Sequence, residues 1–308
     1  MASCCRNDDA LFSNTLAIYR DAGGVKNDIL KRFDLTGKVV AITGGGGELC
    51  GVMAEALGAT GVKVAVLDIN LESAEARSLT VIQSGGTAKA FRCDVLDTGQ
   101  IRECYEAVCS LWGPPDFLIN GAGGNNPRAT TSEEFHGPVG SSGPTTQSFF
   151  DLDPAGFRQV FDLNFMGTFL VSQAFSQGMI KKGRGSIVNI SSMSAFIPLT
   201  KVVAYSAAKA AVSNFTRWLA VHLSPTGVRV NALAPGFFMT EQSRFLLLNQ
   251  KTGEPSPRGH KVIAHTPMGR FGQPDDLIGT LVWLLSDASS FVTGVVVPID
   301  GGFSSYSI

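Results

Sequence analysis

The sequence carries almost no excess charge of either sign. Its 25 lysines and arginines are nearly matched by 26 aspartates and glutamates, which gives a formal net charge of −1. Proteins that bind nucleic acid or an anionic membrane through their overall field need a broad basic surface. We therefore expect no nucleic-acid partner and no membrane partner, and recognition of any anion has to be local.

Cysteines are few and irregularly spaced. The six lie at positions 4, 5, 50, 93, 104 and 109. This pattern lacks the paired short spacings of a zinc site and the density of a disulfide-stapled secreted domain, so reduced thiols are expected. Cys4 and Cys5 have no basic or apolar neighbourhood of the kind that accompanies lipidation, which favours an incidental pair.

Long hydrophobic runs are also missing. Asp8 and Asp9 stand where a secretory signal needs a basic region followed by an apolar run, and no later stretch reaches membrane-spanning length. We therefore expect a cytoplasmic protein. His136, beside Glu133 and Glu134, lies in a polar loop where a lone histidine is usually solvated, so no catalytic metal is expected.

From residue 34 onward, short β-branched runs alternate with longer helical patterns. The expected strands cover residues 38–43, 62–68, 88–95, 116–120, 186–191, 228–234 and 292–299, with helices from about 49, 71 and 99 and over 154–182 and 204–223. This alternation predicts a parallel sheet with helices on both faces. We predict an α/β fold of one domain, a Rossmann-type doubly wound seven-stranded parallel sheet over residues 34–308, after an N-terminal extension of residues 1–33.

Two connections are too long to be simple links, at residues 124–150 and 235–273. Both follow the carboxyl ends of expected strands, where ligands bind in open α/β sheets. They are predicted to act as binding loops or lids.

A glycine run, Gly44 to Gly47, separates the first expected strand from the first helix. In this geometry backbone amides and a helix N-terminus hold a pyrophosphate. Asp68 ends the second strand, where its carboxylate can accept hydrogen bonds from both ribose hydroxyls. The same carboxylate would repel a 2′-phosphate, and no basic residue adjoins it, so NAD (NADH) is favoured and NADP is the lesser alternative.

Tyr205 and Lys209 lie one helical turn apart in the stretch AYSAAKAAVSNF. Tyrosine normally keeps its proton up to a pKa of about 10. A neighbouring ammonium favours the phenolate, so we expect Lys209 to lower the pKa of Tyr205 and make it a general acid and base. The alternative, two polar side chains reaching out of a buried helix, explains the pair but not the glycine turn that accompanies it.

Several motifs occur in the order found in the short-chain dehydrogenases/reductases, which this chain resembles over about residues 34–308. They are TGGGG with Asp68, NGAG at 120–123, Asn164, NISS at 189–192, YSAAK at 205–209 and NALAPG at 231–236. The resemblance implies four catalytic residues, Asn164, Ser192, Tyr205 and Lys209, with Ser191 as the second choice to Ser192. It also implies a cofactor site of Gly44, Gly46, Glu48, Leu49, Asp68, Asp94, Val95, Asn120, Ala122, Tyr205, Lys209, Pro235, Phe238 and Thr240.

The glycine turn departs from the usual family pattern, which has glycine at the positions of Glu48 and Cys50. Gly46, Gly47 and Gly51 can compensate. A carboxylate at position 48 benefits from the helix dipole but repels a pyrophosphate, so we expect it to point away from the ligand.

Within the family, six stretches resemble the bacterial D-mannonate oxidoreductase (fructuronate reductase) type. They begin at Thr43, Asn120, Ser148, Asn189, Ala234 and Thr266. The resemblance implies reversible hydride transfer between NAD(H) and a keto-sugar acid. A carboxylate substrate needs cationic or amide donors, and Arg128, Arg244, Asn126 and Gln242, with Ser192, form the hypothetical substrate clamp. A surface arginine in a loop is the alternative for each arginine.

Two other functions stay open. One is an NAD(P)-dependent ketose reductase or polyol dehydrogenase acting on an uncharged sugar, and the other is a non-catalytic nucleotide-binding sensor. The helices expected at 154–182 and 204–223 carry apolar residues on more than one face, which predicts pairing between copies. The family commonly forms tetramers through these helices, so a homotetramer is expected, with a dimer as second choice.

Overall fold

The computed structural model describes residues 29–137 and 146–307. Within these ranges seven parallel strands form one sheet in the order β3-β2-β1-β4-β5-β6-β7. The strands are β1 Val39–Thr43, β2 Lys63–Asp68, β3 Thr87–Arg92, β4 Phe117–Asn120, β5 Gly185–Ile190, β6 Val228–Pro235 and β7 Val296–Ile299. Strand order reverses between β1 and β4, which opens a ligand crevice at the carboxyl ends of the strands. The predicted doubly wound sheet is confirmed.

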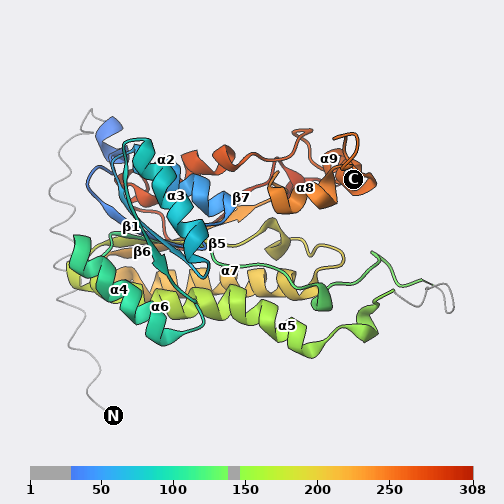
Figure 1. The fold of residues 1–308 in the computed structure, drawn as a ribbon, viewed down its shortest axis with the longest axis horizontal. Coiled ribbons are helices and arrows are strands. Elements are labelled where there is room, and N and C mark those ends of the chain that lie inside the picture. Colours follow the sequence, from blue (N-terminus) through green and yellow to red (C-terminus); the bar gives the residue numbers. More distant parts are fainter. Residues whose placement is uncertain (1–28, 138–145, 308) are drawn as a thin grey trace, which may run out of the picture.

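The central strands are buried along their whole length because helices cover both of their faces. All five residues of β1 and all four of β4 are buried. On one face, α2 (Glu48–Ala59), α3 (Leu71–Gln83) and α10 (Ile278–Leu285) form a core with the sheet, around Met53, Leu57 and Leu281. On the other, α4 (Thr98–Trp112), α6 (Gly167–Lys182) and α7 (Val203–Leu223) enclose Phe175, Ile187 and Leu219 (Figure 1).

The long helix expected at residues 154–182 is interrupted. It consists of α5 (Pro154–Phe161), a π-helical turn over Asp162–Met166, and α6. Asn164 lies inside the π turn with no exposed surface, and its Nδ2 donates to the carbonyl of Val160 at 2.7 Å. The interruption places a polar amide at the carboxyl ends of the strands.

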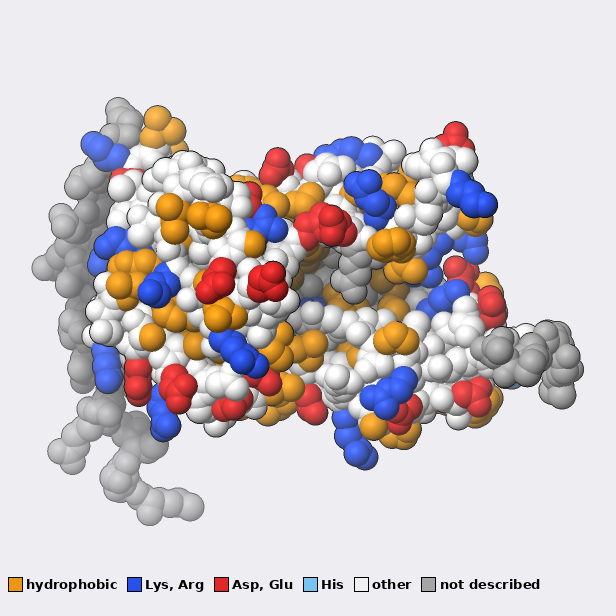
Figure 2. Space-filling model, viewed as in Figure 1, with side chains coloured by type: hydrophobic (Ala, Val, Ile, Leu, Met, Phe, Trp, Pro, Cys, Tyr) orange, Lys and Arg blue, Asp and Glu red, His pale blue; other side chains and the backbone are white. Residues whose placement is uncertain are grey.

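The connection from 235 to 273 contains two short helices that the sequence analysis treated as loop. They are α8 (Glu241–Leu247), capped by Thr240, and α9 (Pro257–Ala264), capped by Ser256. The described part of the other connection holds single 3₁₀ turns at Pro127–Ala129 and Phe149–Asp151. Both connections lie at the same end of the molecule, and the space-filling view shows a hollow between the α8–α9 side and the α5 side (Figures 1 and 2).

The predicted boundary of the N-terminal extension, residues 1–33, stays a prediction. Residues 1–28, including Cys4 and Cys5, lie outside the described residues, while Leu30–Phe33 form a 3₁₀ turn and Leu35 is buried in the core. Among the helices of the described ranges, none has both the length and the apolar character that a membrane crossing requires.

Candidate active site

The glycine turn after β1 is shaped by close backbone packing. Gly44 has φ +63°, and a methyl group on it would lie 2.9 Å from the Cα of Ala122. Gly46 donates its backbone N–H to Oδ2 of Asp68 at 3.0 Å, which fixes that carboxylate beside the turn. The predicted ribose acceptor and the predicted phosphate turn therefore adjoin each other.

Cys50 occupies one of the positions where the family usually has glycine. Its side chain is buried, and a methyl group on Gly121 would lie 2.1 Å from its Sγ. The thiol therefore fills the space that the absent side chain of Gly121 leaves free. Burial raises the pKa of Cys50 to about 12, so this group stays a neutral thiol near neutral pH.

Glu48, at the other departure from the family pattern, is held by the substrate-side connection. Its Oε2 accepts a hydrogen bond of 2.6 Å from the backbone N–H of Glu241. Glu241 begins α8, so this contact joins the glycine turn to the helix above it. The carboxylate is thus directed to α8, and its expected orientation away from a pyrophosphate stays a prediction.

A cavity of about 320 Å³ lies along the glycine turn and the ends of β2, β3 and β4. Seven residues of the predicted cofactor site line it: Gly44, Glu48, Leu49, Asp68, Asp94, Val95 and Ala122. Gly121 and Gly123 of the NGAG motif also line it, as do Cys50, Ile69, Cys93 and Leu163, to which the sequence patterns assigned no contact with the cofactor. A glycine-floored cavity with a carboxylate at the β2 end fits the adenosine and pyrophosphate of a dinucleotide.

Other predicted cofactor residues have structural contacts instead. The amide Nδ2 of Asn120 is directed into the core, where it donates to Ser172 Oγ and Asn189 Oδ1 at 2.9 and 2.8 Å. Phe238 is buried against Gly272. Pro235 ends β6, paired with Ile299, and Thr240 caps α8. Any contact of Asn120 with a cofactor is therefore restricted to its backbone.

The two serines after β5 face in different directions. Ser192 accepts the backbone N–H of Ser194 at 3.1 Å, and its side chain forms a hydrogen bond with Tyr205. Ser191 donates to the carbonyl of Lys209 at 3.1 Å and lies 2.7 Å from Ser213 Oγ. The side chain of Ser192 therefore contacts the phenol of Tyr205, whereas the side chain of Ser191 is buried against α7.

Lys209 is buried with 4% of its surface exposed, and its Nζ donates to the carbonyl of Ile190 at 2.8 Å. The same nitrogen lies 5.6 Å from the centre of the Tyr205 ring. Burial lowers the pKa of Lys209 to about 8, and interaction with Cys50 opposes this shift. The ammonium therefore lies over the ring and donates to the end of β5.

The pKa of Tyr205 shifts in the direction opposite to the expected one, and the causes of the shift do not include Lys209. Burial raises the pKa of Tyr205, and the hydrogen bond with Ser192 lowers it by less. The sequence gives the one-turn spacing of the pair but neither the burial of the phenol nor the direction of the ammonium. A phenol in this environment keeps its proton more firmly than an exposed tyrosine does.

Asn164 fastens the loop after β4 to the catalytic centre. Its Nδ2 donates to the carbonyl of Gly124 at 2.7 Å, and its Oδ1 accepts from the Gly124 N–H at 3.3 Å. A methyl group on Gly123 would lie 2.6 Å from Asn164 Oδ1 and 3.2 Å from Lys209 Nζ. Gly123 therefore leaves the space that lets Asn164 and Lys209 lie close together.

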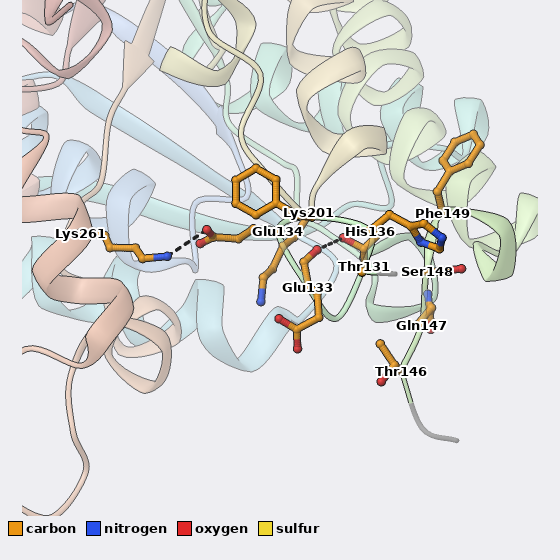
Figure 3. A pocket seen from close by; sticks show the side chains of 12 residues that line it. Thr131, Glu133, Glu134, His136, Thr146, Gln147, Ser148, Phe149, Lys201 and Lys261 are labelled. Atoms are coloured by element: carbon orange, nitrogen blue, oxygen red, sulfur yellow. Dashed lines mark hydrogen bonds and ion pairs between the residues drawn. The ribbon is translucent and has the colours of Figure 1, made fainter. Parts of the chain in front are cut away.

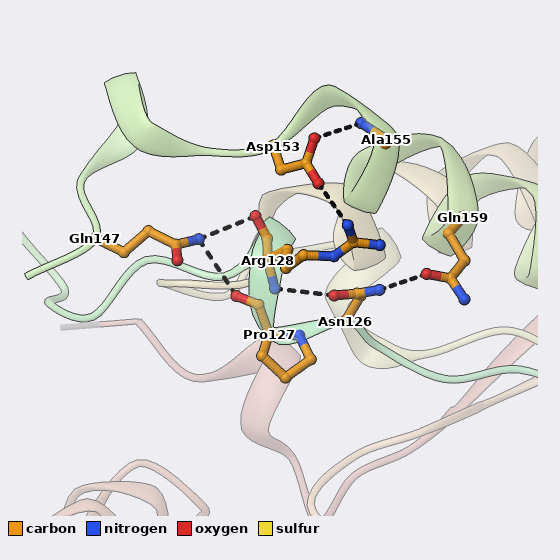
Figure 4. A network of polar contacts seen from close by, with 7 residues as sticks. All are labelled: Asn126, Pro127, Arg128, Gln147, Asp153, Ala155 and Gln159. Atoms are coloured by element: carbon orange, nitrogen blue, oxygen red, sulfur yellow. Dashed lines mark hydrogen bonds and ion pairs between the residues drawn. The ribbon is translucent and has the colours of Figure 1, made fainter. Parts of the chain in front are cut away.

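The structure shows the surroundings of some residues of the predicted substrate clamp but not of all of them. Arg128 forms an ion pair of 3.0 Å with Asp153, and Asn126 bonds to Gln159 at 2.6 Å and to the backbone N–H of Arg128 (Figure 4). These contacts hold the loop together, so they do not support a clamp. Arg244 is exposed on α8, and the side chain of Gln242 lies outside the described residues.

No group of three histidine, cysteine, aspartate or glutamate side chains that could hold a metal ion occurs in the described part of the chain. His136 packs against Phe150, with ring centres 5.7 Å apart. It lines a second cavity beside the loop after β4.

Comparisons with known proteins agree with this geometry. Residues 49–304 match the family model for enoyl-(acyl carrier protein) reductase. The chain is 50% identical to the uncharacterized oxidoreductase UxuB of Bacillus subtilis over 275 residues, 89% of this chain and 97% of the relative. It is 33% identical to D-threitol dehydrogenase of Mycolicibacterium smegmatis over 272 residues, 88% of this chain and 95% of the relative.

Solved structures show the same fold. One from Haemophilus influenzae, which carries the provisional name D-mannonate oxidoreductase and contains bound NAD, has a TM-score of 0.85 and 48% identity over 89% of this chain and 97% of its own. A gluconate 5-dehydrogenase from Burkholderia cenocepacia, in complex with NADP and tartrate, has a TM-score of 0.76 and 29% identity over 90% and 99%. The chain therefore belongs to the short-chain dehydrogenase/reductase family of oxidoreductases.

Proposed function

We propose that this protein uses NAD(H) to interconvert a keto-sugar acid and the corresponding hydroxy acid, of the D-fructuronate/D-mannonate type. The observation that carries this proposal is the convergence of Ser192, Tyr205 and Lys209, with Lys209 next to Gly123, which lines the cavity along the glycine turn. Tyr205 serves as general acid in the reduction and as general base in the oxidation.

In the reduction, Tyr205 donates its phenolic proton to the carbonyl oxygen of the substrate while Ser192 donates a hydrogen bond to the same oxygen. When bound, NADH supplies the hydride. The raised pKa of Tyr205 keeps the phenol protonated at neutral pH, which suits the reductive direction. The positive charge of Lys209, 5.6 Å from the ring centre, lowers the cost of the phenolate that remains after proton transfer.

The proposed preference for NAD over NADP rests on Asp68. Its carboxylate is fixed by the backbone N–H groups of Gly46 and Asn70, both at 3.0 Å, at the end of the cofactor cavity. A 2′-phosphate at this position would meet a like charge. Bound NAD in the Haemophilus influenzae structure supports the proposal, while NADP in the gluconate 5-dehydrogenase shows that other members of the fold accept the phosphate.

The substrate proposal is supported by the name of the Haemophilus influenzae structure. D-threitol dehydrogenase, a more distant relative, supports the alternative, an NAD(P)-dependent ketose reductase or polyol dehydrogenase. Comparing NADH oxidation with D-fructuronate, 5-ketogluconate and D-fructose, with NADPH in parallel, separates the two. Turnover of D-fructose alone would replace the acid proposal with the polyol one, and absence of any turnover would favour a binding protein.

We also propose a homotetramer in the cytoplasm. Trp218 and Val221 on α7 are 57% and 75% exposed, and Ile180 on α6 is 37% exposed, which is a large apolar surface for a helix pair facing water. The described cysteines are free thiols, as a reducing compartment requires. Light scattering should give the mass of four chains, and Val221→Glu should reduce it. A monomeric mass for the unmodified protein would refute the assembly.

A further inference from the structure

A cavity of about 700 Å³ lies between the loop after β4 and α9 (Figure 3). Thr131, Glu133, Glu134 and His136 line it from the loop, while Lys201 lines it from the segment before α7 and Lys261 from α9. These three segments are distant in sequence, so the fold alone brings the two lysines to one cavity. Neither lysine was assigned a role by the sequence patterns.

The carboxylate of Glu134 is surrounded by positive charge. Lys261 Nζ forms an ion pair with its Oε2 at 3.0 Å. This hydrogen bond lowers the pKa of Glu134, and the charges of Lys261, Arg258 and Lys201 add to the effect. Glu133 lines the same cavity, but Figure 3 draws no ion pair between it and either lysine. Two lysines thus line the cavity that holds this carboxylate, and one of them is paired with it.

Lys201 is held in a strained backbone conformation. Its φ is +74°, the one positive value for a residue other than glycine in the described ranges. A left-handed conformation is unfavourable for a residue that carries a side chain, and such strain is concentrated at functional sites. The loop after β4 fixes it on both sides, because Lys201 Nζ donates to Ser132 O at 2.5 Å and Lys201 O accepts from Thr131 N at 3.0 Å.

Lys201 is also near the reacting groups along the chain. It precedes Tyr205 by four residues, a length of chain that spans at most about 14 Å. The ammonium has three donors, of which one is used by Ser132, so two are available to a ligand.

We propose that Lys201 and Lys261 form the site that binds the carboxylate of the substrate, and that Glu134 occupies this site until the substrate displaces it. The inference rests on the proposed function and assigns the acid-recognising cations. The ligand is a carboxylate, because the site already binds the carboxylate of Glu134. This site replaces Arg128, whose guanidinium is paired with Asp153.

Three substitutions test the site through steady-state kinetics with D-fructuronate and D-fructose. Lys261→Gln removes one charge, and Lys201→Asn removes another while keeping a residue that tolerates positive φ. A lost charge-assisted hydrogen bond corresponds to an increase in KM of about 10- to 100-fold for the acid. kcat should change little, and the KM for the neutral ketose should stay constant.

Glu134→Gln gives the opposite result, since it removes the competing carboxylate and should lower KM for the acid several-fold. Lys251→Gln is the matched control, because this exposed lysine between α8 and α9 loses the same charge without lying near Glu134 in the cavity. An unchanged KM for the acid in Lys261→Gln and Lys201→Asn, or a raised KM in Glu134→Gln, would overturn the proposal.

Binding of D-gluconate separates failure of this site from failure of the proposed function. Calorimetry in the presence of NADH should show gluconate binding that weakens at least tenfold in Lys261→Gln and strengthens in Glu134→Gln. If no keto-sugar acid is reduced but this pattern holds, the carboxylate site stands and the proposed reaction fails. If fructuronate is reduced but gluconate binds all variants equally, the reaction stands and the site fails.

Discussion

The ammonium of Lys209 donates a hydrogen bond of 2.8 Å to the carbonyl oxygen of Ile190, at the end of β5. This contact fixes the charge over the Tyr205 ring, with the nitrogen 5.6 Å from the ring centre. It also buries the ammonium, which brings the pKa of Lys209 down to about 8. The charge that supports the phenolate is therefore lost just above neutral pH.

The first prediction is a fall in kcat/KM for ketone reduction as the pH rises through about 8, because the free enzyme then loses the Lys209 proton. Tyr205 keeps its proton over this range, since its pKa is raised. A pH profile from 6 to 10 measures the fall. In Lys209→Arg, whose guanidinium stays charged, activity should be lower and the fall near pH 8 absent; the same fall in that variant would assign it to another group.

The second prediction concerns stability. The pKa of Lys209 is about 8 in the folded protein against 10.5 for the free side chain, so between these values the unfolded chain binds more protons. The penalty for the buried charge is therefore complete below pH 8 and disappears above 10.5. The shift corresponds to a penalty of about 3 kcal/mol for the buried charge. A substitution that removes this charge also removes the hydrogen bond to Ile190, which offsets about 1 kcal/mol of the gain in stability.

Lys209→Met should consequently raise the free energy of unfolding at pH 7 by about 2 kcal/mol while abolishing most activity. Denaturant unfolding at pH 7 and pH 10.5 measures the difference, which should shrink at the higher pH. If Lys209→Met lowers the free energy of unfolding equally at pH 7 and pH 10.5, burial of the ammonium does not destabilise the folded protein.

The third prediction separates the two serines after β5. Ser192→Ala should lower kcat by about 10²- to 10³-fold, as loss of a donor to the developing oxyanion does. Ser191→Ala should retain kcat within about tenfold and lose about 1–3 kcal/mol of stability, because the buried Ser213 hydroxyl loses its partner. Equal kinetic effects would contradict the assignment of Ser192 to the substrate oxygen.

The fourth prediction concerns cofactor choice. Asp68→Asn keeps an oxygen that can accept the Gly46 N–H but removes the charge, so NADPH should be repelled less. The ratio of kcat/KM for NADH to that for NADPH should fall by at least about tenfold, equivalent to 1.4 kcal/mol. Asp94→Asn, a carboxylate lining the same cavity, is the control and should leave the ratio nearly unchanged.

Local patterns predicted the sheet and the glycine turn because both are properties of neighbouring residues. β-branched runs bounded by glycine specify buried strands, and Ser192, Tyr205 and Lys209 follow a fixed order in the family. The same reasoning missed α8 and α9, which are short, although Thr240 and Ser256 are good helix caps. These caps, with Pro257 directly after Ser256, were the signal that could have revealed them.

The rest depended on contacts between distant segments. Glu134 and Lys261 are 127 residues apart, so no spacing indicates that they form a pair. Arg128 was a reasonable cation for a clamp until the fold placed Asp153 beside it. The direction of the pKa shift of Tyr205 likewise follows from its surroundings, which the one-turn spacing to Lys209 does not describe.

The π turn at Asp162–Met166 changes the phase of a helix that would otherwise be a single rod. One additional residue rotates every later side chain by about 100° around the axis. Before the turn, Val160 packs with Ala129 of the loop after β4 and Ala204 of α7; after it, Val171 and Phe175 pack on the sheet. One continuous segment thus packs against two different surfaces, one before the π turn and one after it. Removing a residue from the turn would rotate the side chains of α6 away from the sheet.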